Sequence, residues 1–332
     1  MRTGQQIAGL LPVLLATACP APVQLRALPT LTVLPVGDAL YRLAEDEGFD
    51  DIDFALRVEG PGSGLDIDEM QLDLTVGGVL AWEQRMLRAA VQAHLVRGRS
   101  GPGLNQYENF HLTFPSSLEV DGLRVQLRRD GGTVATQDVP VRRYQQIHRF
   151  HLPVQGCWFV SAGHEFGAEH RRWYTRSHFA WDLMMLDDAD GLQQGKTELA
   201  QYRAFGRTVL APADGTVVLA RDDFPDNPPG IVGAPEASNF LLLDHGAGEF
   251  SKLAHLRQGS LRVSPGQRVQ AGQVLAQVGN SGRSDAPHLH LHFQRTTLDG
   301  DGRVLDEQPV PVALSDYLST SNRGVGVRVD QG

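Results

Sequence analysis

Apolar and polar residues alternate in short runs along the first half of the chain. Such runs lie at residues 54–58, 70–76 and 123–127, and Gly, Pro and Asp separate them. A repeat of two is the side-chain period of a strand with one buried face. The pattern therefore predicts a β-sandwich-like domain over residues 36–150, after a Pro-containing linker over residues 20–35.

One stretch of this domain departs from the alternation. Residues 80–96 have helical spacing and are rich in Ala, Leu, Arg and Gln, but they fit two strands equally well. The residues of this domain carry no pattern that indicates chemistry. We expect the domain to be a spacer or a module that positions a substrate.

The second half of the chain begins near residue 157, where short strands alternate with Gly-rich turns. Residues 209–218 predict a β-hairpin around the Asp214-Gly215 pair, a dipeptide that two-residue hairpin turns favour. The pattern continues through residues 239–244, 250–256 and 269–278. We therefore predict an all-β chain with a second, antiparallel β domain over residues 151–318 and a flexible polar tail over residues 319–332.

The composition of the 332-residue chain is that of a folded protein, with 41% hydrophobic and 21% charged residues. Its length suits about two domains. The 30 Lys and Arg residues are outnumbered by 39 Asp and Glu residues, for a formal net charge of -9. Because no excess of basic residues is left to neutralise a phosphate backbone, we expect no nucleic-acid partner.

The first 19 residues have the order of an export signal. One Arg precedes a short apolar run and the small residues Ala16, Thr17 and Ala18 before Cys19. We expect this segment to direct the chain to the cell envelope, in the periplasm or as a membrane-anchored lipoprotein, or to the medium. The last four residues also resemble a relaxed lipobox, so Cys19 is a candidate lipid anchor, and ordinary cleavage or retention of the signal is the alternative.

The strongest sign of chemistry is the run PHLHLHF at residues 287–293. Successive side chains of a strand point to opposite faces, so His288, His290 and His292 share one face and the apolar residues share the other. Packing does not explain three imidazoles on one face of an apolar strand. We predict a metal or acid-base role for the set, with His292 at the rim of the site or behind its ligands.

A second group of candidates precedes a short apolar run. It consists of His164, His170, His178 and Asp182. Asp182 interrupts a predicted strand between a Trp and a Leu, where a carboxylate is costly unless it is paired or binds a metal. One more candidate, His255, lies at the end of the strand predicted over residues 250–256.

These residue types match the ligands of a hydrolytic zinc site, which takes two His nitrogens and one Asp oxygen and leaves a fourth position for water. Zinc lowers the pKa of that water to about 7 and polarises the carbonyl of the bond to be cut. Further imidazoles can move a proton and stabilise the oxyanion near neutral pH. The candidate residues are sufficient for all of these roles.

The motifs of residues 157–295 resemble the lysostaphin-type zinc endopeptidases. They are Leu-Ala-His255-Leu, the Gly-punctuated run 266–275, Gly-Asn-Ser-Gly at 279–282 and Pro-His288-Leu-His290. The resemblance implies one Zn²⁺ per chain, held by Asp182 and His290, and a catalytic pair of non-ligand residues, His255 and His288. It also implies peptide bonds of bacterial peptidoglycan, in stem peptides or cross-links, as the substrate.

One motif departs from that family. Its usual His-x-Gly-x-Asp reads His178-Phe-Ala-Trp-Asp182 here, with Ala180 in place of the Gly. Residues four apart in an extended strand are about 13 Å apart, whereas the two side chains and their metal bonds span roughly 11 Å. We therefore expect the first zinc ligand to be His170, from a loop upstream as in some relatives of the family, with His178 as the alternative.

Two other functions compete with a peptidase. The Gly-x-x-Val-x-x-Gly-x-x-Leu pattern also resembles biotinyl and lipoyl carrier domains, but residues 269–279 lack the Lys that those carriers modify. A catalytically inactive member of the peptidase family would bind the cell wall or activate an amidase. Such a member usually loses ligands, and this chain has a full set of candidates.

Overall fold

A computed structural model describes residues 28–34, 38–44, 48–60, 67–97, 100–101, 103–164, 170, 177–185, 197–300, 303–317 and 327–329. The predicted export signal over residues 1–19, including Cys19, lies outside these residues. Among the described residues, no helix has the length and apolar character needed to cross a bilayer.

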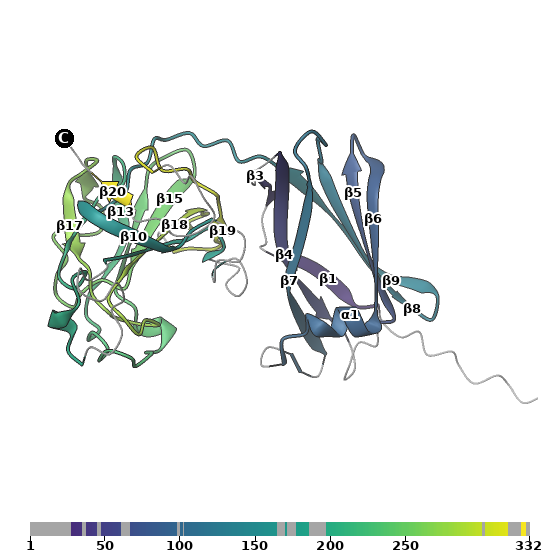
Figure 1. The fold of residues 1–332 in the computed structure, drawn as a ribbon, viewed down its shortest axis with the longest axis horizontal. Coiled ribbons are helices and arrows are strands. Elements are labelled where there is room, and N and C mark those ends of the chain that lie inside the picture. Colours follow the sequence, from purple (N-terminus) through teal and green to yellow (C-terminus); the bar gives the residue numbers. More distant parts are fainter. Residues whose placement is uncertain are drawn as a thin grey trace, which may run out of the picture.

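The N-terminal domain consists of two β-sheets with a shared core (Figure 1). One sheet contains β1 (Thr30–Leu34), β3 (Leu43–Ala44), β4 (Phe49–Glu59) and β7 (Leu104–Pro115). The other contains β2 (Leu40–Tyr41), β5 (Glu69–Val76), β6 (Val79–Leu87), β8 (Gly122–Arg129) and β9 (Gly132–Arg142). Inward residues such as Phe54, Leu72 and Val125 fill the space between them, which confirms the β-sandwich-like fold.

The stretch 80–96 combines the two structures that its sequence allowed. Its first part belongs to β6, and a short helix, α1 (Arg88–Ala93), follows. β6 pairs with β5 through a turn at Gly77 and Gly78, both of which have positive φ. Two Gly residues with positive φ suit the two-residue turn of a hairpin, so this turn overrides the helical composition of residues 80–87.

The second domain is built on a nine-stranded sheet with the order β16-β13-β14-β15-β18-β11-β10-β20 and with β19 paired to β18. Its strands are β10 (Gly156–Ala162), β11 (Trp181–Met184), β13 (Gly215–Arg221), β14 (Phe240–Asp244), β15 (Glu249–Ala254), β16 (Arg268–Val269), β18 (Leu289–Arg295), β19 (Gln308–Pro309) and β20 (Val327–Val329). β12 (Thr208–Leu210) and β17 (Val274–Gln277) form a separate pair. The 3-10 helices η3 (Leu199–Gln201) and η4 (Pro235–Ala237) lie in the connections.

The structure differs from two of the predictions about this domain. The hairpin predicted over residues 209–218 is wrong, because β12 pairs with β17 whereas β13 pairs with β14 and β16. Gly215 is needed for close packing, since a Cβ there would lie 2.8 Å from the Asp244 carbonyl oxygen. Within the tail expected over residues 319–332, β20 pairs with β10.

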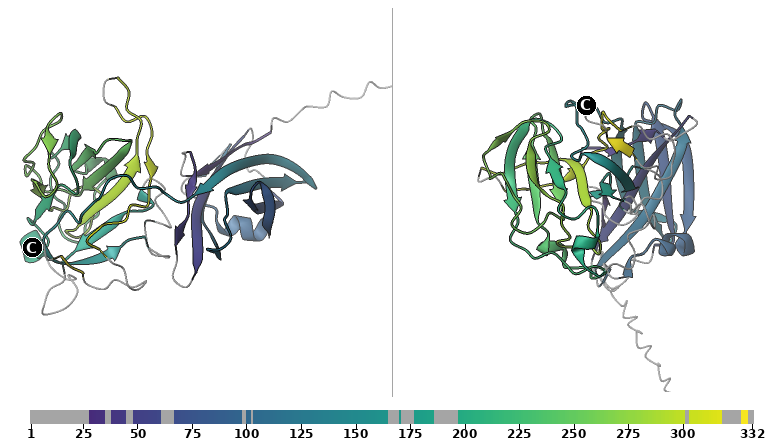
Figure 2. Two further views of the ribbon diagram at one scale, coloured as in Figure 1. Left: turned by 90° about the horizontal axis from the view of Figure 1, so that it is seen from above. Right: turned by 60° about the vertical axis from the view of Figure 1, so that its left-hand side comes forward.

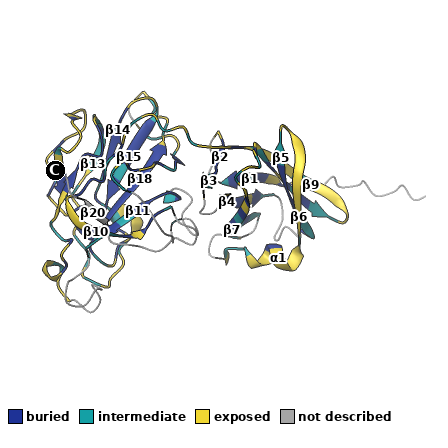
Figure 3. Ribbon diagram, turned by 45° about the horizontal axis from the view of Figure 1, so that its top comes forward, coloured by how far each residue is buried: buried dark blue, intermediate teal, exposed yellow. Residues whose placement is uncertain are grey.

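The central strands of the second domain alternate as predicted. On β18, Leu289, Leu291 and Phe293 enter the apolar core, and His290 and His292 occupy the opposite face. Figure 3 shows that β14, β15 and β18 are mostly buried. One face of this sheet is therefore available to carry polar side chains in an enclosed environment.

A row of directly paired residues crosses five strands of this sheet. Arg221 on β13 faces Phe240 on β14, and Phe240 faces Ala254 on β15. Ala254 in turn faces His290 on β18, and His290 faces Asp182 on β11. Residues directly opposite in antiparallel strands share a face, so the five side chains belong to one surface.

The segment that joins the domains is anchored on the second domain (Figure 2). The buried carboxylate of Glu249 accepts hydrogen bonds from the Tyr144 hydroxyl at 2.5 Å and from the backbone nitrogens of Ile147 and His148, both at 2.9 Å. The N-terminal domain adds Ala39, which lies in the core of the second domain and accepts a hydrogen bond from Gln308 Nε2 at 2.9 Å. These contacts attach the segment between the domains to the nine-stranded sheet.

Candidate metal centre and active site

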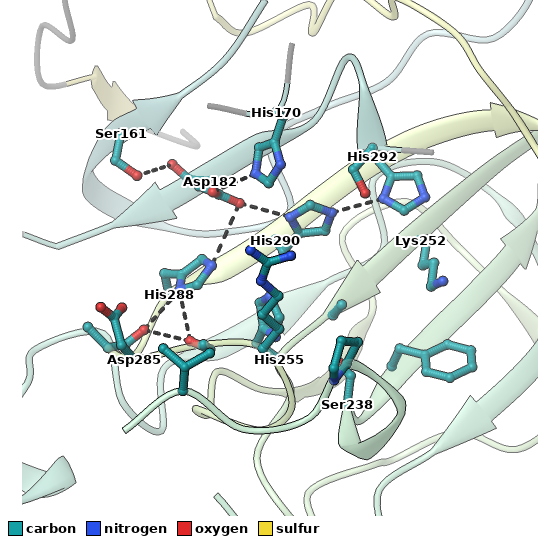
Figure 4. Close-up of a pocket in the computed structure, with 18 of the residues that line it drawn as sticks. Ser161, His170, Asp182, Ser238, Lys252, His255, Asp285, His288, His290 and His292 are labelled. Carbon is teal, nitrogen blue, oxygen red and sulfur yellow. Dashed lines mark hydrogen bonds and ion pairs between the residues drawn. The ribbon is translucent and has the colours of Figure 1, made fainter. Parts of the chain in front are cut away.

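Three side chains converge on the polar face of the nine-stranded sheet. Asp182 and His290 lie opposite each other, with Oδ1 2.9 Å from Nδ1. Nε2 of His170 lies 2.7 Å from the other carboxylate oxygen, Oδ2. One candidate ligand atom from each residue lies within 4.8 Å of the other two (Figure 4). Two imidazoles and one carboxylate at this separation fit the donor set of a hydrolytic zinc site.

The electrostatics of these residues suit a metal. Burial alone would raise the pKa of Asp182, but the charge of His288 and the hydrogen bonds with His170 and His290 outweigh it and hold the pKa well below its usual range. Burial lowers the pKa of His290 to about 4, although the hydrogen bond with Asp182 acts in the opposite direction. At neutral pH Asp182 is therefore ionised and His290 is neutral, as metal ligands must be.

A chain of hydrogen bonds along β18 sets the tautomer of His290. Gln294 donates from Nε2 to the Thr296 hydroxyl at 2.5 Å, so its Oε1 accepts from Nε2 of His292 at 2.9 Å. His292 Nδ1 then accepts from Nε2 of His290, also at 2.9 Å. When a metal occupies the position between His290 Nδ1 and Asp182 Oδ1, this chain of bonds holds the proton of neutral His290 on Nε2 and leaves Nδ1 unprotonated to bind the metal. His292, predicted at the rim of the site or behind its ligands, is buried behind His290.

His255 lies where β15 ends, in a conformation that side chains seldom adopt. Its φ of 60° is in the left-handed region. The ring donates from Nδ1 to the Ser281 carbonyl oxygen at 2.8 Å, which leaves Nε2 as the basic atom. Burial lowers the pKa of His255 well below its usual range, and the neighbouring charges of His288 and His290 lower it further. The imidazole is thus a neutral base held in a strained turn.

His288 lies beside this base, with a distance of 4.7 Å between the two ring centroids. Its Nδ1 lies 2.8 Å from the Ala286 carbonyl oxygen and 3.2 Å from the Ser284 hydroxyl. Its Nε2 lies 3.7 Å from Asp182 Oδ1. The ring therefore sits at the edge of the three-residue centre, and backbone and side-chain oxygens fix its orientation.

His178 lies elsewhere. Its Nε2 is 3.7 Å from Asp53 Oδ2, a carboxylate of β4 in the N-terminal domain, and the side chain is buried. Asp53 also contacts His111, with its Oδ1 2.7 Å from Nδ1. His164 is likewise outside the centre, because its Nε2 binds the Phe179 carbonyl oxygen at 2.8 Å and its ring lies against Trp181. The described part of the chain thus brings His170, and not His178, to Asp182 and His290.

One cavity of about 710 Å³ is lined by His170, Asp182, His255, His288, His290 and His292. The same cavity is lined by Arg221, Phe240 and Lys252, which the sequence interpretation did not single out. Lys252 lies three residues before His255 in the sequence, so its position near the site could have been inferred. Arg221 and Phe240 had no comparable signal, because only the pairing of their strands carries them to the site.

Comparison with known proteins identifies relatives of the second domain. Residues 199–306 match the model of peptidase family M23. The chain is 33% identical over 88 residues to the peptidoglycan DD-endopeptidase ShyA of Vibrio cholerae serotype O1, which covers 26% of this chain and 17% of that protein. It is 29% identical over 116 residues to ShyB, a peptidoglycan DD-endopeptidase of the same organism, with 35% and 24% covered.

These alignments cover only part of each relative. The chain spans less than a quarter of the length of ShyA or ShyB. Among solved structures, the catalytic domain of lysostaphin from Staphylococcus simulans is 20% identical and covers 44% of this chain and 84% of its own, with a TM-score of 0.25.

Proposed function

We propose that the chain, whose residues 199–306 match the model of peptidase family M23, is a zinc-dependent endopeptidase of bacterial peptidoglycan. The observation that carries the proposal is the convergence of His170, Asp182 and His290 in one cavity with the imidazoles of His255 and His288. The names of ShyA and ShyB support peptidoglycan as the substrate. The cell envelope is the compartment where that substrate occurs.

In this proposal His170, Asp182 and His290 hold one zinc ion. When bound, zinc supplies Lewis-acid polarisation of the scissile carbonyl and lowers the pKa of water. The β18 hydrogen-bond chain keeps the proton of His290 on Nε2, so that Nδ1 remains a ligand. Asp182 stays ionised because its imidazole neighbours hold its pKa low.

His255 and His288 perform the proton chemistry. The unprotonated Nε2 of His255 is suited to accept a proton from the attacking water, because Nδ1 is already committed to the Ser281 carbonyl oxygen. His288 donates from Nδ1 to the Ala286 carbonyl oxygen and presents Nε2 toward the same centre. In its doubly protonated form it would donate from Nε2 to the carbonyl oxygen of the substrate and stabilise the negative charge that develops there. The proton that His255 takes from the water can pass to the leaving amine as the C–N bond breaks, so peptide-bond hydrolysis needs no covalent enzyme intermediate.

A digest of purified peptidoglycan tests the activity. We expect the zinc-loaded protein to release peptides whose masses differ from the intact cross-linked fragments by one water per cleaved bond, and chelation to abolish the release. Retention on the wall without any product in the presence of bound zinc would support the alternative, an inactive member that binds the cell wall or activates an amidase. The mass of each product would also identify the bond that is cut.

A further inference from the structure

We propose that Arg221 and Lys252 form a subsite of the cavity that binds a free carboxylate of the peptide substrate. This inference rests on the proposed peptidase function and adds the substrate class to it. Both cations line the same cavity as His290, and both approach one aromatic ring, that of Phe240. The subsite therefore has two cationic groups on one platform.

The guanidinium of Arg221 is held in place before any ligand binds. Its Nη1 donates to the Glu236 carbonyl oxygen at 3.1 Å, and its Cζ lies 5.3 Å and 5.7 Å from the ring centroids of Phe224 and Phe240. Within the described residues, no carboxylate forms an ion pair with it. Since a guanidinium has five N–H donors, a planar fork remains for a carboxylate.

Lys252 supplies the second cation. Its Nζ lies 4.9 Å from the ring centroid of Phe240 and 3.8 Å from Glu307 Oε1, a separation longer than a hydrogen bond. None of the hydrogen bonds among the described residues involves this ammonium group. Figure 4 shows Lys252 on the side of His292, with Asp285 on the opposite side, next to His288.

The pairing of the strands places this subsite at a defined distance from the bond to be cut. Phe240 and His290 belong to the same row of side chains, with β15 between their strands. Two strand spacings amount to roughly 10 Å, the length of about three residues of an extended peptide. A peptide that lies across the strands would therefore place a carboxylate about three residues from its scissile bond beside the two cations that contact Phe240.

This arrangement selects among the peptides of the wall. A stem peptide with a free carboxylate gains a charge-assisted, two-pronged contact with Arg221. An uncharged oligoglycine bridge, or a stem peptide whose carboxylate is amidated, gains nothing there. We therefore expect the enzyme to prefer acidic peptide substrates.

Matched substrates and variants test the subsite. The substrates are two cross-linked peptides that differ only in a free or an amidated carboxylate about three residues from the cleaved bond. We expect Arg221→Gln to lower kcat/KM for the acidic peptide by about 10- to 100-fold, the range for a lost hydrogen bond to a charged group, and to lower it much less for the amidated peptide. Lys252→Gln is expected to act in the same direction, and Arg221→Lys to retain part of the preference.

Arg268→Gln is the control, because Arg268 is an exposed residue of β16 that does not line the cavity. The subsite is refuted if the wild type cleaves both peptides equally, or if Arg221→Gln affects both peptides to the same extent. No cleavage of either peptide by the zinc-loaded wild type would instead refute the proposed function. The two failures are therefore distinguishable.

Discussion

Asp182 and His290 are 108 residues apart in the sequence, yet the Oδ1 of one lies 2.9 Å from the Nδ1 of the other. They meet because β11 and β18 are neighbours and pair these two residues directly. Each has a second partner, His170 for Asp182 and His292 for His290. The centre is therefore held by the sheet and by hydrogen bonds behind it, and each of these supports can be tested.

The assignment of His170 as the first zinc ligand is tested by a comparison of two His residues. We predict that His170→Ala lowers zinc affinity by at least about 100-fold, because it removes one of three donors. His178→Ala should change zinc affinity little, since His178 contacts Asp53 rather than the centre. A chelator competition titration measures both, and the reverse ranking would return the ligand role to His178.

The hydrogen-bond chain on β18 predicts a second effect on zinc. His292→Phe keeps a ring of similar size but removes the acceptor for His290 Nε2. We expect zinc affinity to fall about 10- to 100-fold, the usual cost of losing a hydrogen-bond partner of a ligand. Thr296→Val, at the far end of the chain, is the matched control and should cost less. Equal affinities for wild type and His292→Phe would show that the chain does not orient the ligand.

Removal of His288 separates catalysis from metal binding. We expect His288→Ala to retain one zinc per chain, measured by elemental analysis, and to lose peptidase activity by about 10²- to 10⁴-fold, the usual contribution of a positioned proton-transfer group. His255→Ala should behave in the same way. Full activity in the His288 variant would remove that residue from the mechanism, and loss of zinc would make it a ligand.

Glu249 predicts a pH-dependent contribution to stability. Burial would raise its pKa, but the hydrogen bonds from Tyr144, Ile147 and His148 lower it below the ordinary 4.5. A lowered carboxyl pKa stabilises the fold above about pH 4.5, and the stabilisation disappears as the pH falls through the folded-state value. Denaturant titrations should show Glu249→Gln less stable by about 1.5–3 kcal/mol at pH 7.

The difference from wild type should shrink below pH 4.5. Asp223→Asn, a change at an exposed carboxylate, should show no such trend. If Glu249→Gln destabilises the protein equally from pH 7 to pH 3, the charge of Glu249 is not what stabilises its contacts with the segment between the domains.

Export is a prediction from the first 19 residues alone. We expect cell fractionation to find the chain in the envelope or the medium. Membrane association that Cys19→Ser abolishes would identify the lipid-anchored form. Recovery of the chain from the cytoplasm with Met1 retained would contradict export.

Local patterns in the sequence were enough to predict several features of the fold and of the candidate site. The period of two in residues 287–293 places His290 and His292 on one face of a strand, because side-chain direction in a strand depends only on position. The spacing of the Gly and His motifs was likewise enough to predict the match of residues 199–306 to peptidase family M23 and, through that resemblance, an all-β second domain. Asp182 was identifiable because an acidic residue between apolar neighbours needs a partner.

Only the tertiary structure decided which residues meet. The Asp214-Gly215 pair predicts a hairpin by its dipeptide, but pairing with distant strands separates β12 from β13. Arg221 and Phe240 reach the cavity through the register of β13, β14 and β15. The position of His170 next to Asp182 depends on the path of the chain between them. Register and chain path result from packing across many residues, and a local pattern contains no information about them.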